Sequence, residues 1–398
     1  MNKKAKEIDL WILAGQSNME GVGELSQALA PNDEVFCFSS AGNWEIATEP
    51  LHRFWESFTP VHQDLCRADL AEESKHLSDK ELAMSTAAER QYGTGLGLAF
   101  GQAMSKVLNR PIGLLPCAHG GTSLEQWSPD KKSEGGRSLY GAMFERIKRS
   151  GGTPRGLLWY QGESDAWNSE TGASYGPRFE QWIKRLRDDI GDPTFPVLIV
   201  QISRTTLDSP DPSAWNQIQQ VQYDLPTRLP YTAVTSAIDL PLVDCIHINA
   251  NGLKRLGGRL ARLALAMTTT PNALSGPRLL RAESQAEPPD RGLVRLSFSG
   301  VSGGWLPADH MAGFDILTAE GQAHPINRVI NAFRDLEDPT VIWVRLNIPL
   351  QSGDKVVYGI GLNTYCNVTD EADQPLCACS IADPLARTSS PIKRNTVI

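Results

Sequence analysis

Ser17, Asp244 and His247 are the residues of this sequence whose types and spacing best suit acyl transfer. Ser17 follows an apolar segment within the stretch GQSN, and a turn of this kind can present a hydroxyl together with its own backbone N–H. Asp244 and His247 are three residues apart, so the carboxylate can reach one imidazole nitrogen while the other faces the serine. We therefore predict Ser17 as nucleophile, His247 as general base and Asp244 as its partner. For Ser17 the alternative is a strand followed by an ordinary capped helix.

Acyl transfer also needs hydrogen-bond donors for the oxyanion that develops on the ester carbonyl. The Ser17 N–H is one candidate, and Gly121 is a second because the glycines of HGGTS allow close backbone approach. The side-chain amide of Gln161, in QGESD, is the third. For Gly120 and Gly121 the alternative is a plain turn between a strand and a helix. For Glu163 a structural carboxylate is favoured over a catalytic one, although whether Gln161 or Glu163 faces the oxyanion is left open.

The polar clusters adjoin expected strands and helices. Short apolar segments predict buried strands, and apolar residues at helical spacing between them predict helices. The expected strands are 9–15, 110–118, 155–162, 196–203 and 231–239, and the expected helices are 96–109, 138–150, 174–191, 213–226 and 249–267. This alternation predicts a three-layer α/β/α domain with a parallel sheet. GQSN, HGGTS and QGESD follow the first three strands and DCIH precedes the last helix, so all four are expected to converge beyond the carboxyl ends of the strands.

The sequence changes character after Met267. A stretch rich in Thr, Pro and Gly comes first, and strand-like segments separated by turn residues follow it. These segments are 293–300, 313–319, 340–347 and 354–361. Since 398 residues exceed what one core usually fills, we predict two domains. The site-bearing domain is expected over 1–268, a linker over 269–288 and a β-rich, sandwich-like accessory domain over 289–398.

The composition is that of an ordinary globular protein, with 41% hydrophobic and 21% charged residues. A formal net charge of -8 argues against a nucleic-acid partner, because phosphate backbones are bound by an excess of Lys and Arg. No apolar run approaches the roughly 20 residues that span a bilayer, so no membrane partner is expected. The first residues do not form a signal peptide, and the chain as written is expected in the cytoplasm. Removal of a signal from a longer sequence would instead point to secretion or the periplasm.

Seven scattered cysteines resemble no disulfide framework, so we expect reduced thiols. Cys377 and Cys379, with Cys366 nearby, are a weak metal candidate because their spacing matches none of the usual zinc patterns. We expect neither a metal nor a cofactor.

The stretches GQSNMEG, GGTSLEQW, LLWYQGESD and DCIH together resemble the SGNH/GDSL hydrolase superfamily. Within it they resemble the sialate O-acetylesterase-like branch, which includes the acetylxylan esterases of carbohydrate esterase family six. The resemblance covers about residues 9–267 and implies a flavodoxin-like fold with the catalytic and oxyanion residues given above. GQSN stands where the superfamily has G-D-S, and QGESD replaces the block whose Asn usually donates to the oxyanion.

The resemblance implies a serine esterase that removes O-acetyl groups from a carbohydrate through an acyl-enzyme. Acetylated xylan, other oligosaccharides and O-acetyl sialic acid are all open as substrates, and the sequence says nothing of oligomeric state. One alternative is a general short-chain carboxylesterase on the same three residues. The other is a non-catalytic carbohydrate-binding protein, which the joint presence of the three residues argues against.

Several further residues are candidates for the substrate pocket or its surroundings. They are Gln16, Asn18, Gly120, Glu163 and Trp127. Trp127 and Trp167 are candidates to stack on a sugar face, with an ordinary core position as the alternative. For His52 and His119 a packing or hydrogen-bonding role is at least as well supported as catalysis. Ser302, in GVSGG, has the spacing of a nucleophile elbow, but its flanks are β rather than strand and helix, so we set it aside.

Overall fold

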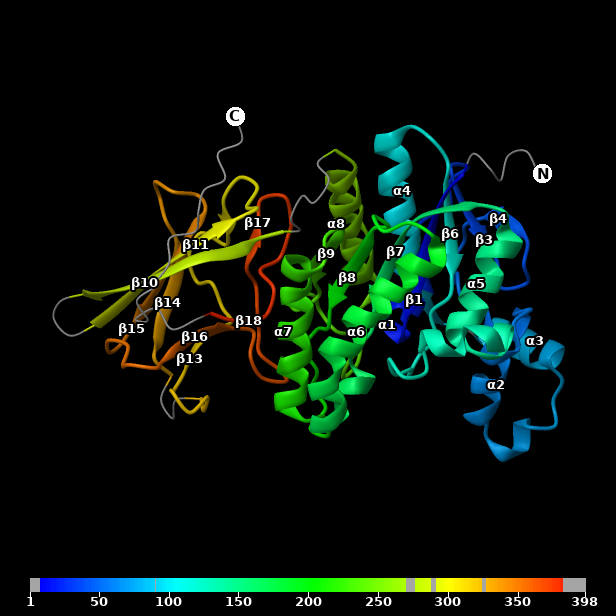
Figure 1. Cartoon of the computed structure of the whole chain (residues 1–398), viewed down its shortest axis with the longest axis horizontal. Coiled ribbons are helices and arrows are strands. Elements are labelled where there is room, and N and C mark those ends of the chain that lie inside the picture. Colours follow the sequence, from blue (N-terminus) through cyan, green and yellow to red (C-terminus); the bar gives the residue numbers. More distant parts are fainter. Residues whose placement is uncertain (1–7, 90, 270–275, 288–290, 324–326, 382–398) are drawn as a thin grey trace. The chain divides into compact units, whose positions relative to one another are not determined.

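The computed structural model describes residues 8–89, 91–269, 276–287, 291–323 and 327–381. It divides the chain into two compact units (Figure 1). The first comprises Met1–Gly276 with Gly361–Asn363, and the second comprises Pro277–Ile360 with Thr364–Ile398.

A seven-stranded sheet lies at the centre of the first unit, in the order β4-β3-β6-β1-β7-β8-β9. Its strands are β1 (Asp9–Gly15), β3 (Val35–Phe38), β4 (Trp44–Ile46), β6 (Ile112–Pro116), β7 (Thr153–Tyr160), β8 (Val197–Gln201) and β9 (Thr232–Ser236). All neighbours are parallel except β3 and β4, which pair antiparallel at one edge. Because β6 lies on one side of β1 and β7 on the other, the winding reverses at β1. Ligands of open α/β sheets bind at such a reversal.

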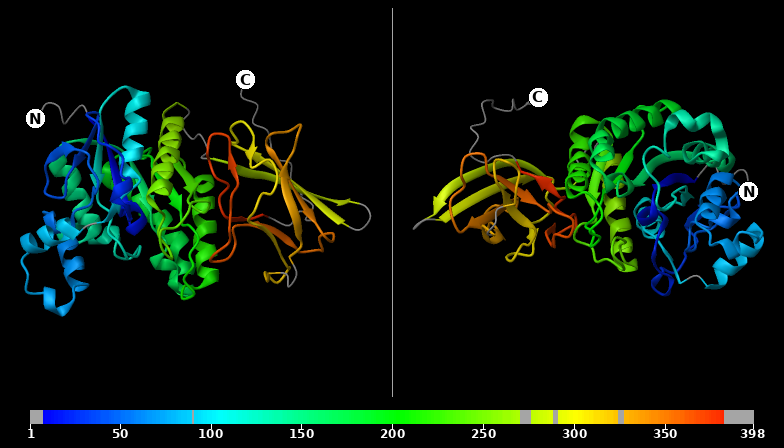
Figure 2. Two further views of the ribbon diagram at one scale, coloured as in Figure 1. Left: turned by 180° about the vertical axis from the view of Figure 1, so that it is seen from behind. Right: turned by 90° about the horizontal axis from the view of Figure 1, so that it is seen from below.

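Helices cover both faces of this sheet (Figure 1 and Figure 2). The long ones are α4 (Gly97–Leu108), α5 (Leu139–Ser150), α6 (Ser169–Ile190), α7 (Pro212–Arg228) and α8 (Ala250–Thr269). Trp11 of β1 packs edge-on against Phe100 of α4, and Trp159 of β7 packs against Trp182 of α6. Trp11 is paired with Gly156, three residues before Trp159, so side-chain alternation places the two tryptophans on opposite faces. Since α8 packs on α4 and α7 on α6, the expected three-layer arrangement is confirmed.

Shorter elements complete the first unit. They are α1 (Ser17–Glu20), β2 (Gly23–Glu24), η2 (Leu25–Gln27), η3 (Phe54–Glu56), α2 (Pro60–Ala68), η4 (Glu72–Ser74), α3 (Asp79–Glu89), β5 (Tyr92–Thr94), η5 (Pro129–Arg137) and η6 (Ser164–Trp167). The sequence analysis did not predict β3, β4, α2 or α3. The edge strands β3 and β4 are only four and three residues long, and the apolar residues of α3 do not fall on one face.

The second unit is built of antiparallel strands, as expected for an all-β region. One sheet has the order β10-β11-β15-β14, a second has β13-β16-β18, and β12 pairs with β17. Their bounds are β10 (Arg278–Glu287), β11 (Arg291–Ser299), β12 (Trp305–Leu306), β13 (Phe314–Leu317), β14 (Val329–Arg334), β15 (Val341–Leu346), β16 (Lys355–Tyr358), β17 (Thr369–Asp370) and β18 (Cys379–Ser380). Alternate residues of β11 are buried, among them Val294, Leu296 and Phe298, so one face of this sheet forms a core.

The linker that we predict over 269–288 is too long at its carboxyl end. Arg278–Glu287 forms β10, which belongs to the second unit and pairs along its length with β11. The sequence of β10, RLLRAESQAE, lacks a regular apolar alternation, so pairing with β11 rather than its own pattern makes it a strand. Residues 270–275 of the predicted linker lie outside the described residues.

Candidate active site

Ser17 lies at the carboxyl end of β1, where the strand turns into the short helix α1. Gly15, the last residue of β1, has a φ of 131°, and a Cβ built on it would lie 2.1 Å from the carbonyl oxygen of Tyr160. Only glycine fits at that position. The Gln16 N–H donates to the same carbonyl at 2.9 Å. Strand β7 therefore holds the turn that carries the Ser17 hydroxyl.

The structure brings Ser17, His247 and Asp244 together in one chain of hydrogen bonds. His247 Nε2 lies 2.9 Å from Ser17 Oγ, and His247 Nδ1 lies 2.7 Å from Asp244 Oδ2. Ser17 and His247 are 230 residues apart in sequence, so only the fold makes this contact. These are the distances expected between a nucleophile, a base and the group that orients the base.

Asp244 is held as an anion by its hydrogen bonds. Its Oδ1 accepts from the backbone N–H groups of Ile246 and His247, each at 2.8 Å. Partial burial acts to raise the pKa of Asp244. The hydrogen bonds from the His247 side chain and from the two backbone amides outweigh burial, so the pKa lies below its usual value. A carboxylate in this state can stabilise an imidazolium at His247.

Asn18 connects the serine turn to the loop that carries His247. The Asn18 Oδ1 accepts from the Ile248 N–H at 3.0 Å, and its Nδ2 lies 3.4 Å from the carbonyl oxygen of Ile246. These two isoleucines flank His247 in sequence. The side chain of Asn18 is buried, so its hydrogen bonds do not compete with water. Asn18 therefore fastens the backbone on both sides of His247.

Glu163 lies behind Asn18 and is also buried. Its Oε1 accepts from Asn18 Nδ2 at 3.0 Å, while Oε2 has no hydrogen-bond partner among the described residues. Burial raises the pKa of Glu163, although the Asn18 hydrogen bond and the charge of His247 act in the opposite direction. These contacts favour the structural role that we predict for Glu163.

The backbone amides of Ser17 and Gly121 are the two candidate donors to an oxyanion. Gly120 lies against Ser17, since a Cβ built on it would be 3.5 Å from Ser17 Cβ. Its own N–H is engaged with Glu20 Oε2 at 2.9 Å. Gly121 has a φ of 68°, where glycine is favoured. Within the described part of the chain, the N–H groups of Ser17 and Gly121 have no acceptor, which leaves both free for an oxyanion.

Gln161 does not have the geometry that a third oxyanion donor needs. It is fully buried, and its Nε2 donates to the Thr122 carbonyl at 3.1 Å and to Asp165 Oδ2 at 2.7 Å. Both hydrogens of the amide are therefore engaged within the protein. Gln161 connects the HGGTS loop to QGESD instead. Gln16 makes a similar connection, since its Oε1 accepts from the Ser164 N–H at 3.3 Å.

Trp127 cannot stack on a sugar, because its side chain is fully buried. Its ring packs edge-on against Trp159, and its Nε1 donates to Thr122 Oγ1 at 3.1 Å. Trp127 therefore supports the loop that carries Gly120 and Gly121 through its hydrogen bond to Thr122. Trp167, at the end of η6, is 46% exposed and stays a candidate for contact with substrate.

His52 and His119 belong to a second, buried group of histidines beside the same turn. His52 Nδ1 lies 2.9 Å from the Glu20 carbonyl oxygen, and His52 Nε2 accepts from the Ala118 N–H at 3.2 Å. His119 Nδ1 lies 3.1 Å from His62 Nδ1. Burial lowers the pKa of His119 to about 4, and it lowers the pKa of His62 well below its usual value. His62 and His119 are therefore neutral supports for the loops around the site.

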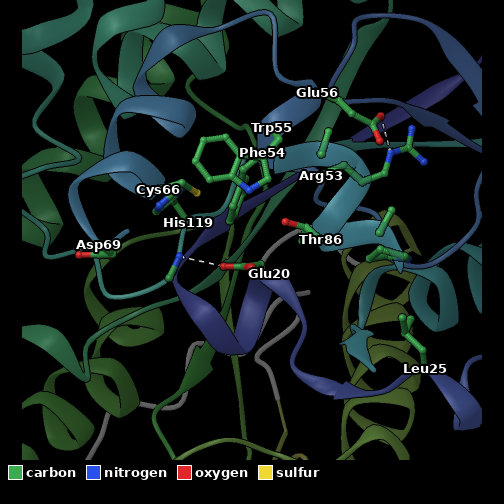
Figure 3. Close-up of a pocket in the computed structure, with 14 residues that line it drawn as sticks. Glu20, Leu25, Arg53, Phe54, Trp55, Glu56, Cys66, Asp69, Thr86 and His119 are labelled. Carbon is green, nitrogen blue, oxygen red and sulfur yellow. Dashed lines mark hydrogen bonds and ion pairs between the residues drawn. The ribbon is translucent and has the colours of Figure 1, made fainter. Parts of the chain in front are cut away.

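A cavity of about 500 Å³ adjoins the Ser17 turn (Figure 3). Glu20 and Gly120 form its edge toward Ser17, and the wall around it includes residues of η3, α2 and α3. This volume is typical of small-molecule sites. Glu20 is not among the predicted site residues, although a carboxylate three residues after Ser17 is a visible signal. The wall was likewise not predicted, because the helices that form it were not.

No group of three or more His, Cys, Asp or Glu side chains suited to a metal ion occurs among the described residues. The seven cysteines all lie among the described residues, and none of them forms a disulfide bond there. Within the described ranges, no helix combines the length and the apolar character needed to cross a bilayer.

Comparison with known proteins identifies the class of this protein as a carbohydrate O-acetylesterase. A family model described as "Carbohydrate esterase, sialic acid-specific acetylesterase" matches residues 7–266, which is more than half of the chain. The chain belongs to this family, as the four motifs predict. It is 30% identical over 280 residues to a probable carbohydrate esterase of Arabidopsis thaliana, and the match covers 65% of this chain and 90% of that protein.

Solved structures that resemble the chain include the following two. The carbohydrate acetylesterase XAC1771 from Xanthomonas citri is 22% identical with a TM-score of 0.64, and the match covers 94% of this chain and 80% of that one. This likeness supports the fold over both units. The structure of the Arabidopsis thaliana protein is 28% identical with a TM-score of 0.49, and the match covers 65% of this chain and 98% of that one.

Proposed function

We propose that the enzyme removes O-acetyl groups from carbohydrates by a serine mechanism in which Ser17 is the nucleophile. The observation that carries this proposal is the chain of hydrogen bonds from Ser17 Oγ through His247 to Asp244, at 2.9 and 2.7 Å. Asp244 is oriented by two backbone amides and keeps its charge, so it holds the His247 ring with one nitrogen toward the serine.

In the first step Ser17 Oγ bonds to the acetyl carbonyl carbon while its proton passes to His247 Nε2. The carbonyl oxygen becomes an oxyanion that accepts hydrogen bonds from the Ser17 and Gly121 N–H groups. The bond from the carbonyl carbon to the sugar oxygen then breaks, and His247 returns its proton to that oxygen. Water repeats the sequence on the acetyl-enzyme and releases acetate. The contacts of Gln161 do not support a third donor at this residue.

The decisive experiment combines one variant with one label. We expect Ser17→Ala to reduce kcat for acetate release from an acetylated sugar by about 10⁴-fold or more, because no other group takes the place of the nucleophile. A serine-directed phosphonate should label the native enzyme at Ser17 and should not label the variant. Circular dichroism and a thermal melt establish that the variant is folded.

Three results would contradict the proposal. A folded Ser17→Ala variant with native activity would remove the serine mechanism. Hydrolysis of butyryl and longer esters at a higher kcat/KM than acetyl esters would favour a general short-chain carboxylesterase, and sugar binding without turnover would favour a non-catalytic carbohydrate-binding protein.

A further inference from the structure

The charges around the cavity beside Ser17 are mainly negative. Glu20, Glu56 and Asp69 line it from three separate segments, and Figure 3 shows their carboxylates around the space. Glu56 and Asp69 are exposed to solvent. Glu20 lies at the end nearest Ser17, where its Oε2 accepts the Gly120 N–H at 2.9 Å.

Among the lining residues that the structure describes, Arg53 is the only Lys or Arg, and it is already paired. Its Nη2 lies 2.7 Å from Glu45 Oε1, and its Nε lies 2.8 Å from Glu56 Oε2. An anionic ligand would have to displace one of these carboxylates to use the guanidinium. The positive charge that an acidic sugar needs is therefore not available at Arg53.

The neighbouring side chains add no net positive charge. Burial lowers the pKa of His119 to about 4, so this cavity residue is neutral at physiological pH. Arg67 lies over the Trp55 ring at 5.6 Å, but it forms an ion pair with Asp79. The rest of the wall is largely apolar and aromatic, as Phe54 and Trp55 show in Figure 3.

We infer that this cavity selects acetylated sugars without a carboxylate, and that Glu56 and Asp69 are specificity-determining residues. The inference rests on the proposed function of Ser17 and narrows its substrates. A cleft lined by one sign of charge lowers the local concentration of ligands with the same sign. A sugar carboxylate that entered would also lose water without gaining a cationic partner. Sialic acids carry such a carboxylate, so this chain should disfavour the sugar in its family's description.

The test compares 9-O-acetyl-N-acetylneuraminic acid with its C1 carboxamide, which differ by one negative charge. We expect kcat/KM for the native enzyme to be about tenfold higher or more for the carboxamide at low salt. The ratio should shrink as salt is raised, because these carboxylates lie near solvent. An equal kcat/KM for the two substrates, or a higher one for the acid, would overturn the inference.

Variants of the cavity residues test whether Glu56 and Asp69 cause the preference for the carboxamide. Glu56→Gln and Asp69→Asn, separately and together, should lower the carboxamide-to-acid ratio, whereas Asp33→Asn should leave it unchanged. Asp33 is exposed just before β3, at the amino-terminal edge of the sheet, away from the site. If the ratio is the same in the cavity variants as in Asp33→Asn, these residues do not determine specificity.

Binding measurements test the preference of the cavity independently of the serine mechanism. Calorimetric titration with N-acetylneuraminic acid and its C1 carboxamide, the deacetylated forms of the two compounds, reports on the cavity without any chemical step. Tighter binding of the carboxamide supports the inference, even if Ser17→Ala keeps its activity and the serine mechanism fails. Equal binding, or a failure of both compounds to bind, contradicts the inference while leaving the mechanism standing.

Discussion

Two groups of histidines stand beside Ser17, and they differ in their partners. His247 is partly exposed, and its Nδ1 faces a carboxylate, that of Asp244. His52, His62 and His119 are buried, and their ring nitrogens face backbone groups or one another. The residue type is therefore the same in the two groups. The carboxylate and the access to water distinguish them.

This difference has a direct chemical meaning. A general base has to accept a proton during the reaction, and Asp244 stabilises the imidazolium that forms at His247. Burial lowers the pKa of His119 to about 4, so protonation there is unfavourable at neutral pH. The buried histidines are suited to holding loops and not to moving protons. The predictions below test this division.

The largest effect is expected at His247. His247→Ala should lower kcat by about 10⁴-fold or more, because Ser17 loses the group that takes its proton. His119→Gln should act chiefly on KM, because His119 lines the cavity but does not contact Ser17 Oγ. Steady-state acetate release from folded variants checks both. An equal loss of kcat in the two variants would show that His247 and the buried histidines do not differ in function.

Asp244→Asn should come next, with a fall in kcat of about 10²- to 10⁴-fold. The amide preserves the size of the side chain but cannot stabilise a positive His247, and it favours the wrong tautomer of the ring. KM should change little, since Asp244 is placed behind the base. A variant with native kcat would show that the carboxylate merely positions the loop.

The convergence of the site could be predicted from sequence because it follows from topology. GQSN follows β1 and DCIH precedes α8, and any parallel sheet wound in this way brings such segments to one edge. Ser17, Asp244 and His247 are in contact as expected. The spacing of the last two already limits how they can meet, because both lie in one short loop.

The orientation of Gln161 and Trp127 could not be predicted in the same way. Gln161 turns toward Thr122 and Asp165, and Trp127 packs against Trp159, so contacts between separate loops and elements set both positions. A sequence pattern predicts where a strand ends but not the direction in which a side chain points there.

The cavity wall could not be predicted from the sequence for a similar reason. Its helix α3 has no one-sided apolar pattern and depends on its neighbours for stability.

A smaller effect is expected at Asn18, which fastens the loop around His247. Asn18→Ala should lower kcat by about 10- to 100-fold, because a slight displacement of the base lengthens its hydrogen bond to Ser17. Glu163→Gln is the matched control, since a Gln side chain can still accept from Asn18 Nδ2. It should lower kcat much less than Asn18→Ala.

The readout for Asn18 should separate positioning from simple destabilisation. If Asn18 positions the base, kcat falls at temperatures far below the melting point and KM stays near its native value. If the loss of kcat disappears at lower temperature, or if KM rises in parallel, Asn18 acts through global stability instead.

The smallest effect on catalysis, and a distinct effect on stability, is expected from acidification of the buried histidines. Between about pH 6.5 and pH 4 the unfolded chain binds a proton at His119 that the folded chain does not, so the free energy of unfolding falls as the pH falls. For His119 alone the change amounts to at most about 3 kcal/mol. His62 acts in the same direction, because burial lowers its pKa too. His119→Gln should therefore flatten the pH dependence of urea unfolding in this range, and His62→Gln with His119→Gln should flatten it further. If the free energy of unfolding of the double variant depends on pH as steeply as that of the native enzyme, His62 and His119 accept protons in the folded state. The buried histidines would then not differ from His247 in their ability to accept a proton.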